Sequence, residues 1–137
     1  MSKYDSFQTT LTEEGALVAA LKALGYPVEI HTQPMPLFGY HGDERPERAH
    51  IIIRRNHLDC ASNDIGFVRN ADGQFSAILS EYDRSIGFDQ KWLNRVHQRY
   101  KEERTLAMAR QRGYVLRGRQ VIQTEQGEQV KLLFGMR

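Results

Sequence analysis

The chain is poor in cysteine, with Cys60 alone among its 137 residues. One thiol cannot form a disulfide within the chain, and it cannot build a zinc site from cysteine ligands. The segment His57-Leu58-Asp59-Cys60 does bring a base, an acid and a thiol close together in sequence. Catalytic triads assemble in space, however, so this proximity is weak support for a nucleophilic site.

Long apolar segments are also missing. The longest runs are short, such as Ala16–Leu21 and Ile51–Ile53, whereas a helix needs about 20 apolar residues to cross a bilayer. The first residues show neither a basic start followed by an apolar core nor a small-residue cleavage site, which are the marks of an export signal. We therefore expect no membrane span and a cytoplasmic location.

The motifs of several common enzyme classes are absent. The chain has no Gly-x-Ser-x-Gly turn, no Walker loop and no Gly-x-Gly-x-x-Gly loop. These motifs hold a serine nucleophile or the phosphates of a nucleotide. The sequence therefore favours a protein that is not an enzyme and that needs no cofactor.

What the chain does contain is the composition of one folded domain, with 40% hydrophobic and 26% charged residues. We expect residues 1–137 to form this single domain. Its charge is unevenly spread: residues 1–82 hold 7 basic and 11 acidic side chains, and residues 83–137 hold 12 basic and 6 acidic ones. The C-terminal part is therefore basic, which permits an acidic partner, including nucleic acid.

Two helices are predicted. The first has Thr12 as its expected N-cap, apolar residues at helical spacing, and a stop at Gly25 and Pro27. The second starts after Asp89, a plausible cap, and ends at Gly113. Apolar residues repeat along it at Trp92, Val96 and Tyr100, and roughly two dozen residues make it over ~30 Å long.

Strands are predicted on both sides of these helices. Three prolines and two glycines in residues 32–49 predict an irregular loop there. The remaining segments are a weakly alternating strand at Ser6–Leu11, a strand at His50–Arg55, a hairpin of Ile65–Arg69 and Gln74–Ser80 around Asn70-Ala71-Asp72-Gly73, and a last hairpin of Tyr114–Gln123 and Gln129–Phe134. In the last strand Val130, Leu132, Phe134 and Met136 alternate.

The predicted fold is α+β, with a mainly antiparallel sheet and two helices packed on it. The element order is β-α-β-β-β-β-α-β-β, in which the loop of residues 32–49 follows the second strand, and a long C-terminal helix is followed by a β-hairpin. Hairpins, rather than a regular βαβ rhythm, connect most of the strands.

Several short motifs, taken in order, resemble the domain of unknown function 1257 family of plastid, cyanobacterial and other bacterial proteins. They are Leu24-Gly25-Tyr26, Gly39-Tyr40-His41-Gly42, Asp64-Ile65-Gly66-Phe67, Gly87-Phe88-Asp89-Gln90, Leu93-Asn94-Arg95, Gln98-Arg99-Tyr100 and Gly113-Tyr114. The resemblance covers nearly the whole chain. Lys101-Glu102-Glu103 stands where the family pattern has a second aromatic residue.

This resemblance implies an accessory role, because the genes of the family look like companions of ATPase-type and ferredoxin-type proteins. It implies no catalytic residue, since the family has no catalytic motif to match. A protein partner of one of these two kinds is the expectation that follows.

Basic side chains of the C-terminal part are the first candidate binding site. They are Arg95, Arg99, Lys101, Arg104, Arg110, Arg112, Arg117 and Arg119, with Tyr100 among them and Lys131 and Arg137 further on. Such a cluster would bind phosphates or carboxylates. It would also suit a solvated helix face, because Glu102 and Glu103 interrupt it and arginine stems cover apolar surface.

The loop offers a second set of candidates, Phe38, Tyr40 and His41, because aromatic residues are frequent in binding hot spots. These side chains could instead fold the loop back onto the core, and this is the interpretation that we favour. His41, His50 and His57 are weak candidates for metal ligands, since their spacing matches no compact metal motif.

The leading hypothesis is a non-enzymatic accessory protein that binds another protein. The first alternative is a nucleic-acid-binding protein that uses the basic C-terminal helix and hairpin. The second alternative is a small enzyme or metal-binding protein that uses His41, His50 or His57.

Overall fold

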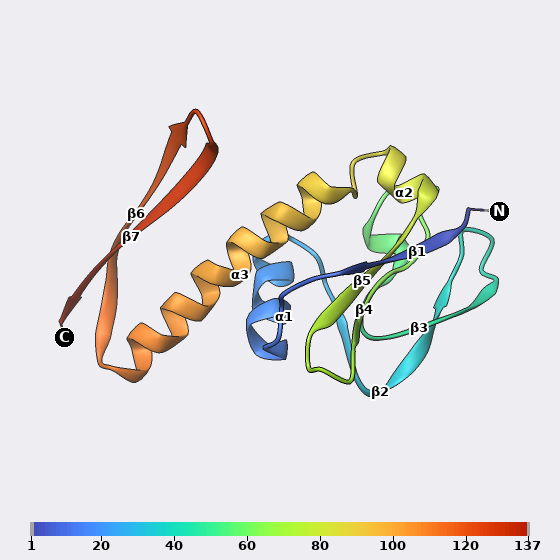
Figure 1. Ribbon diagram of the computed structural model, residues 1–137, viewed down its shortest axis with the longest axis horizontal. Coiled ribbons are helices and arrows are strands. Elements are labelled where there is room, and N and C mark those ends of the chain that lie inside the picture. The colour runs from blue at the N-terminus through green and yellow to red at the C-terminus, as the bar shows by residue number, and fades with distance from the viewer. Residues whose placement is uncertain (1, 137) are drawn as a thin grey trace.

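The computed structural model describes residues 2–136 of the chain (Figure 1). Its elements are β1 (Tyr4–Gln8), α1 (Glu14–Ala23), β2 (Glu29–Phe38), β3 (Glu44–Ile53), a 3₁₀ turn at Arg55–His57, β4 (Ile65–Arg69), β5 (Phe75–Ser80), α2 (Glu81–Ser85), α3 (Gln90–Gln111), β6 (Tyr114–Thr124) and β7 (Gly127–Met136). The predicted order of strands and long helices is confirmed, and the short helix α2 and the 3₁₀ turn add to it.

The strands form two separate antiparallel sheets. Five strands pair in the order β1-β5-β4-β3-β2, and β6 pairs only with β7. The α+β class, the antiparallel sheet and the long helix before a hairpin are therefore confirmed. The β6–β7 hairpin starts near the C-terminal end of α3 and folds back beside this helix, apart from the larger sheet (Figure 1). We call residues 2–102 the body and residues 103–136 the arm.

The hydrophobic core of the body lies between one face of the larger sheet and the two long helices (Figure 1). Leu17 and Leu21 of α1 share a helical face, and both are fully buried. Trp92 opens the corresponding face of α3, and its ring packs against Phe88 at a centroid distance of 5.4 Å. Within residues 2–136, no helix is long and apolar enough to cross a membrane.

The two helix starts differ in how they are capped. The carboxylate of Asp89 accepts hydrogen bonds from the backbone N–H groups of Lys91 and Trp92, at 3.0 and 3.2 Å, so the predicted cap of α3 is confirmed. The predicted Thr12 cap of α1 is wrong, because Glu13 occupies that position without a side-chain bond. The backbone N–H groups of Thr12 and Glu13 instead donate to the hydroxyl of Tyr100, at 3.2 and 3.0 Å.

The irregular loop predicted at residues 32–49 is also wrong, because β2 and β3 cover most of it and only residues 39–43 form the turn. Pro34 and Pro46 fit because they lie outside the paired positions of these strands, where a missing N–H group breaks no ladder bond. Pro34 falls in a register shift of β2, which is an edge strand. Pro46 lies in the part of β3 that extends past its pairing with β4, which is limited to Ile51–Ile53.

A smaller core lies on the other face of the sheet, where the β2–β3 hairpin comes close to β4. A Cβ atom at Gly66 of β4 would lie 2.5 Å from the Cβ atom of Ala49 and 3.0 Å from a methyl carbon of Leu37. Both of these neighbours are fully buried. Only glycine therefore lets the hairpin approach the sheet this closely.

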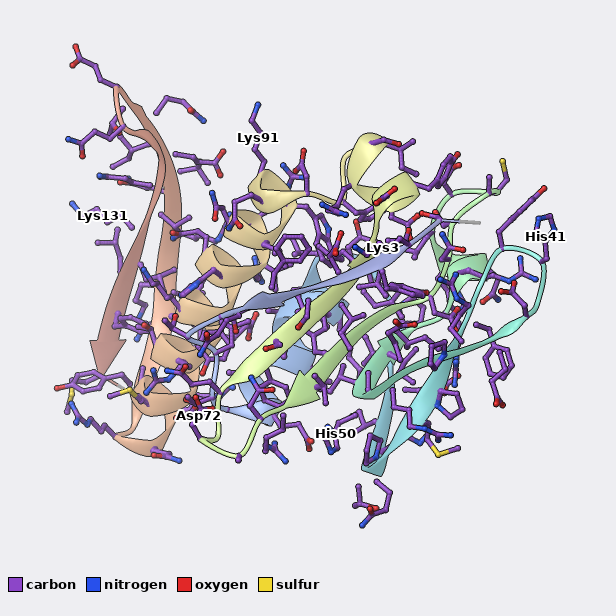
Figure 2. All side chains as sticks on the ribbon, turned by 45° about the vertical axis from the view of Figure 1, so that its right-hand side comes forward. Lys3, His41, His50, Asp72, Lys91 and Lys131 are labelled. Atoms are coloured by element: carbon purple, nitrogen blue, oxygen red, sulfur yellow. The ribbon has the colours of Figure 1, made fainter. Side chains whose placement is uncertain are left out.

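Side chains of the arm and of the β2–β3 turn occupy opposite ends of the molecule. Figure 2 shows Lys131 of β7 at one end and His41, in the β2–β3 turn, at the other. The basic arm and the turn residues are therefore two distinct surfaces, and one ligand of small size cannot contact both.

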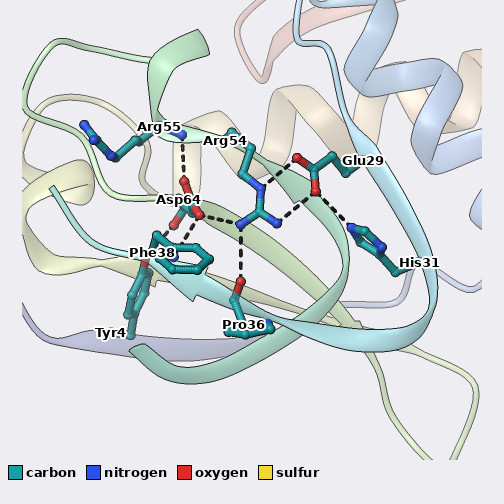
Figure 3. Close-up of polar contacts among 8 residues, drawn as sticks. All are labelled: Tyr4, Glu29, His31, Pro36, Phe38, Arg54, Arg55 and Asp64. Carbon is teal, nitrogen blue, oxygen red and sulfur yellow. Dashed lines mark hydrogen bonds and ion pairs between the residues drawn. The ribbon is translucent and has the colours of Figure 1, made fainter. Parts of the chain in front are cut away.

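A polar network fixes the end of β2 to the segment before β4 (Figure 3). The carboxylate of Asp64 is 1% exposed and accepts three hydrogen bonds. Its donors are the backbone N–H groups of Phe38 and Arg55, at 2.8 and 2.7 Å, and the guanidinium of Arg54, at 2.8 Å. A buried carboxylate needs such donors, because transferring its charge from water to the protein interior costs free energy unless hydrogen bonds replace those to water.

The guanidinium of Arg54 extends this network to the surface. It donates to both carboxylate oxygens of Glu29 at 2.8 Å, and His31 approaches one of these oxygens at 2.9 Å (Figure 3). The hydrogen bonds from Arg54 lower the pKa of Glu29 to about 2. They also raise the pKa of Arg54 above its ordinary value.

We expect Gly66→Ala to destabilise the fold by about 1–3 kcal/mol, because the new methyl group overpacks the smaller core. Thermal or urea denaturation measures the effect. Gly15→Ala is the matched control, since a Cβ atom in this first turn of α1 meets nothing within 4 Å. This control should leave stability unchanged or raise it by up to about 1 kcal/mol, and equal effects of the two variants would contradict the close approach.

The Glu29–Arg54 pair gives stability a dependence on pH in the acid range. The pKa of Glu29 is lower in the folded state, so its contribution is present above the ordinary pKa of 4.5 and is lost as pH falls towards about 2. At pH 7, Glu29→Gln should cost about 1 kcal/mol, a small value because the pair is partly exposed.

Urea denaturation from pH 7 to pH 2.5 measures this dependence, and the difference between Glu29→Gln and the unsubstituted chain should shrink below pH 4.5. Glu44→Gln is the control, because this exposed carboxylate on β3 forms no ion pair within residues 2–136. A Glu29→Gln difference that is constant with pH would show that the pair does not stabilise the fold.

Candidate functional site

The arm contributes nothing to the hydrophobic cores of the protein. Among the described residues, the last buried hydrophobic side chain is Tyr100, and the last buried residue of any kind is Glu102. Large apolar side chains are nevertheless exposed along the arm: Met108, Tyr114, Leu116, Val121, Ile122, Leu133 and Met136. The arm therefore has apolar surface that the chain itself does not cover.

The pairing of β6 with β7 sorts these side chains into two faces. Residues paired in register lie on the same face, so Leu116 with Phe134, and Val121 with Val130, share what we call the inner face. Arg119, paired with Leu132, also lies on this face, and its side chain reaches α3. The opposite, outer face carries Gln120, Ile122, Gln129, Lys131 and Leu133.

Glu102 joins the arm to the body. Its side chain is only 4% exposed, and its carboxylate lies 2.9 Å from the guanidinium of Arg99 and 3.0 Å from that of Arg119. Arg99 is three residues earlier on α3, where helix geometry places it beside Glu102, and Arg119 comes from β6. Two guanidinium groups thus compensate one buried carboxylate, and they set the angle of the hairpin.

A groove of about 390 Å³ lies between α3 and the inner face. Arg95, Gln98 and Arg99 line it from the helix, and Arg119 and Val130 line it from the hairpin. Leu24, at the end of α1, adds an exposed apolar side chain. The groove is therefore an open, partly apolar surface with a basic border.

The predicted basic residues are divided between ion pairs and free surface. Arg99 and Arg119 pair with Glu102, and Arg104 lies 3.3 Å from the carboxylate of Glu13. Arg117 donates to the backbone carbonyl of Met136 at 3.1 Å. Within residues 2–136, the predicted basic side chains that are exposed and form no ion pair are Arg95, Lys101, Arg110, Arg112, Arg117 and Lys131.

Tyr100 is not part of this surface. Its side chain is 3% exposed in the core, and its hydroxyl accepts the two hydrogen bonds before α1. Its predicted role as a binding residue is therefore replaced by a structural one.

Loop and histidine candidates lie elsewhere and do not come together. The guanidinium carbon of Arg54 lies over the ring of Phe38, 5.6 Å from the ring centroid. Tyr40 is exposed, and its ring packs against that of His41 with the ring centroids 4.8 Å apart. Residues 2–136 contain no group of three or more His, Cys, Asp or Glu side chains that could hold a metal ion.

His50 has a structural partner. Its Nδ1 atom accepts a hydrogen bond from the backbone N–H of Arg69 at 3.0 Å, and burial lowers the pKa of the ring. A neutral imidazole can accept this bond, whereas a protonated one cannot. His50 thus connects β3 with the end of β4.

Glu102 is the residue of this site that sequence reasoning missed. It was interpreted as an interruption of the basic run, whereas it is the carboxylate that organises two of the basic residues. The spacing of Arg99 and Glu102 on one helix was a usable signal, but the third member, Arg119, is 17 residues further on in another element.

A family model described as protein of unknown function (DUF1257) matches residues 20–131, which confirms the resemblance seen in the sequence. No curated protein and no solved structure matches significantly.

We expect Glu102→Gln to loosen the arm, because a neutral amide cannot hold both guanidinium groups. Hydrogen exchange of the amides in β6 and β7 should become faster, equivalent to a loss of about 1–2 kcal/mol for opening. The core strands of the body should keep their protection. Glu103→Gln is the matched control, since Glu103 pairs only with Arg99, at 3.1 Å; equal exchange in both variants would show that Glu102 does not fix the arm.

Proposed function

This chain belongs to the DUF1257 family of proteins of unknown function, and we propose that it is a non-enzymatic accessory protein that binds an acidic protein partner through its arm. The observation that carries the proposal is the exposed apolar hairpin. Leu116 and Val121 are each 45% exposed on the inner face, and no residue of the arm belongs to a hydrophobic core.

A hairpin of this kind needs a partner for physical reasons. An isolated two-stranded hairpin is only marginally stable in water, because it has no second layer to cover its apolar face. Contiguous apolar patches on soluble proteins are usually interaction sites. The ion pair of Glu102 in the body with Arg119 in the arm fixes the hairpin at an angle that leaves its inner face open.

Charge indicates which kind of partner fits. Residues 103–136 carry six basic and three acidic side chains, so the arm attracts an acidic surface. Two arms of identical chains would both be basic and would repel each other. A protein surface with an apolar centre and carboxylates around it complements the arm better than a second copy does.

Nucleic acid is a weaker alternative. The observation in its favour is that Arg95, Lys101, Arg110 and Arg112 are exposed and form no ion pair within residues 2–136. Against it, Arg99, Arg104 and Arg119 are already paired with carboxylates. Apolar strand faces also gain little from phosphate groups, which bind basic side chains.

The family resemblance suggests ATPase-type and ferredoxin-type proteins as the first partners to test. The proposal includes a cytoplasmic location, where an exposed free thiol such as that of Cys60 stays reduced.

Site-specific photo-crosslinking in cells that naturally express the protein tests this function. A photoreactive amino acid replaces Val121 on the arm or, as the control, Ile30 on β2; these positions are 45% and 49% exposed. Position 121 should yield one stoichiometric adduct with a different, acidic protein, and position 30 should not. No adduct, or adducts only with nucleic acid or with a second copy of the chain, would contradict the proposal.

With the captured partner purified, Phe134→Ser should weaken binding by about tenfold or more, since it removes an aromatic side chain from the inner face. Ile30→Ser is the matched control and should leave affinity unchanged. Binding should also weaken as salt rises, because opposite charges attract across the interface. Equal affinities for the two variants would place the interface outside the arm.

A further inference from the structure

Four strands of the protein have an open edge, because β1 and β2 end the larger sheet and β6 and β7 form a sheet of two. Open edges expose backbone N–H and C=O groups that can pair with another chain, and proteins usually protect them. The usual devices are short length, proline and local irregularity of the pairing. These four edges differ in which devices they carry.

Three of the four edges are protected. β1 is only five residues long. β2 contains Pro34 and Pro36 and has two register shifts against β3. β6 has an extra residue, Arg117, between Leu116 and Gly118 in its pairing with β7. Each of these features interrupts or shortens the row of backbone groups that an added strand would need.

β7 has none of these three devices, and its protection is limited to two charged side chains. It runs for ten residues, Gly127–Met136, without proline, and its only charged side chains are Glu128 and Lys131. Its residues follow one another without a gap in the pairing with β6. An unbroken, weakly charged edge of this length is a template for strand addition.

We infer that the acidic partner binds as an added β-strand along β7, an inference that rests on the proposed function of the arm. The added strand would pair with the outward N–H and C=O groups of β7 and would extend the two-stranded sheet to three strands. Main-chain hydrogen bonds supply affinity in this mode, and alternate side chains supply specificity.

The two faces of β7 define the sequence pattern of the added strand. On the inner face, Val130, Leu132 and Phe134 would lie beside it, so its residues on that face are apolar. On the outer face it would lie beside Lys131, and the side chain of Arg117 crosses Gly135 there, 2.8 Å from where a Cβ atom would be. Its residues on that face are therefore acidic.

A second copy of the chain does not supply this pattern. Its own β7 would present Gln129, Lys131 and Leu133 on the outer face, with no carboxylate among them. Two such strands side by side would bring like charges together instead of opposite ones. The alternation of apolar and acidic residues thus points to a different protein.

A synthetic peptide of alternating valine and glutamate, with blocked ends, is the probe. The full chain should bind it at least tenfold more tightly than a peptide of the same composition in which the valines and glutamates form separate blocks. Fluorescence anisotropy measures the affinities. Hydrogen exchange should show new protection of alternate amides in β7, and none in β1 or β2.

Charge reversal tests the outer face. Lys131→Glu should weaken binding of the valine–glutamate peptide by about tenfold and should strengthen binding of a valine–lysine peptide by a similar factor. Lys91→Glu is the matched control, because Lys91 is an exposed residue of α3 that lies well away from β7 (Figure 2). Protection of β6 amides by exchange reports that the hairpin is still formed in each variant.

Strand addition is wrong if the alternating peptide binds no better than the block peptide, or if β7 amides gain no protection. It is also wrong if the unliganded chain dimerises with its β7 amides protected, since the edge is then occupied by a second copy. These results are separable from the proposed function: a partner captured at position 121 that is insensitive to Lys131→Glu leaves the arm as an interface and excludes only the added strand.

Discussion

The buried carboxylate of Asp64 is the constraint on which the body depends. It lies just before β4, close to the end of β2 and to the 3₁₀ turn that follows β3. It accepts hydrogen bonds from Phe38 at the end of β2 and from Arg54 and Arg55 after β3. The backbone carbonyl of Asp64 accepts a hydrogen bond from the hydroxyl of Tyr4 at 2.6 Å, so β1 is also connected to this network. Burial, and then the nearby charge of Asp64, raise the pKa of Tyr4 above its ordinary value, so this hydroxyl keeps its proton. Removing one partner of a buried charge pair costs roughly 3–5 kcal/mol, a large fraction of the stability of a domain of this size.

The arm is held in a different way. The body has two cores and the polar network of Asp64, whereas the arm is joined to the body by the ion pairs of Arg119 with Glu102 and of Arg104 with Glu13. Local stability therefore falls along the chain from Tyr100 onwards, as expected for a segment that carries a binding surface. The packing that stabilises the fold lies in the body, and the proposed binding surface lies in the arm. Substitutions on the hairpin can change what the arm contacts without changing the packing of the larger sheet.

Local features of the fold were accessible from the sequence. Asp89 caps α3 because a side-chain carboxylate can reach N–H groups two and three residues on, and Gly73 closes the β4–β5 turn with φ +86°. Asp72 itself does not have a positive φ, because among residues 2–136 only glycines have one. The prolines of residues 32–49 misled the strand prediction, since their effect depends on whether the strand lies at an edge.

Long-range features were not accessible from the sequence, because they depend on contacts between residues that are far apart along the chain. Asp64 pairs with the N–H of Phe38 across 26 residues, and Tyr100 with residues 12 and 13 across more than 80. The basic residues of the candidate site were identified from composition, but their division into paired and free groups depends on where Glu102 and Glu13 lie in space. Which strand edge is open is likewise a property of the assembled sheets.

The order of the body and the arm along the chain bears on how the protein folds during synthesis. Every core residue has been translated once Tyr100 has been added, and residues 101–136 follow over a period on the order of seconds at about 5–20 residues per second. Mixed α/β two-state domains fold within about milliseconds to a second. β7 is synthesised after every strand of the larger sheet, so these strands leave the ribosome first and can begin to pair with one another. This order favours correct pairing of the larger sheet over mispairing with the unprotected edge of β7.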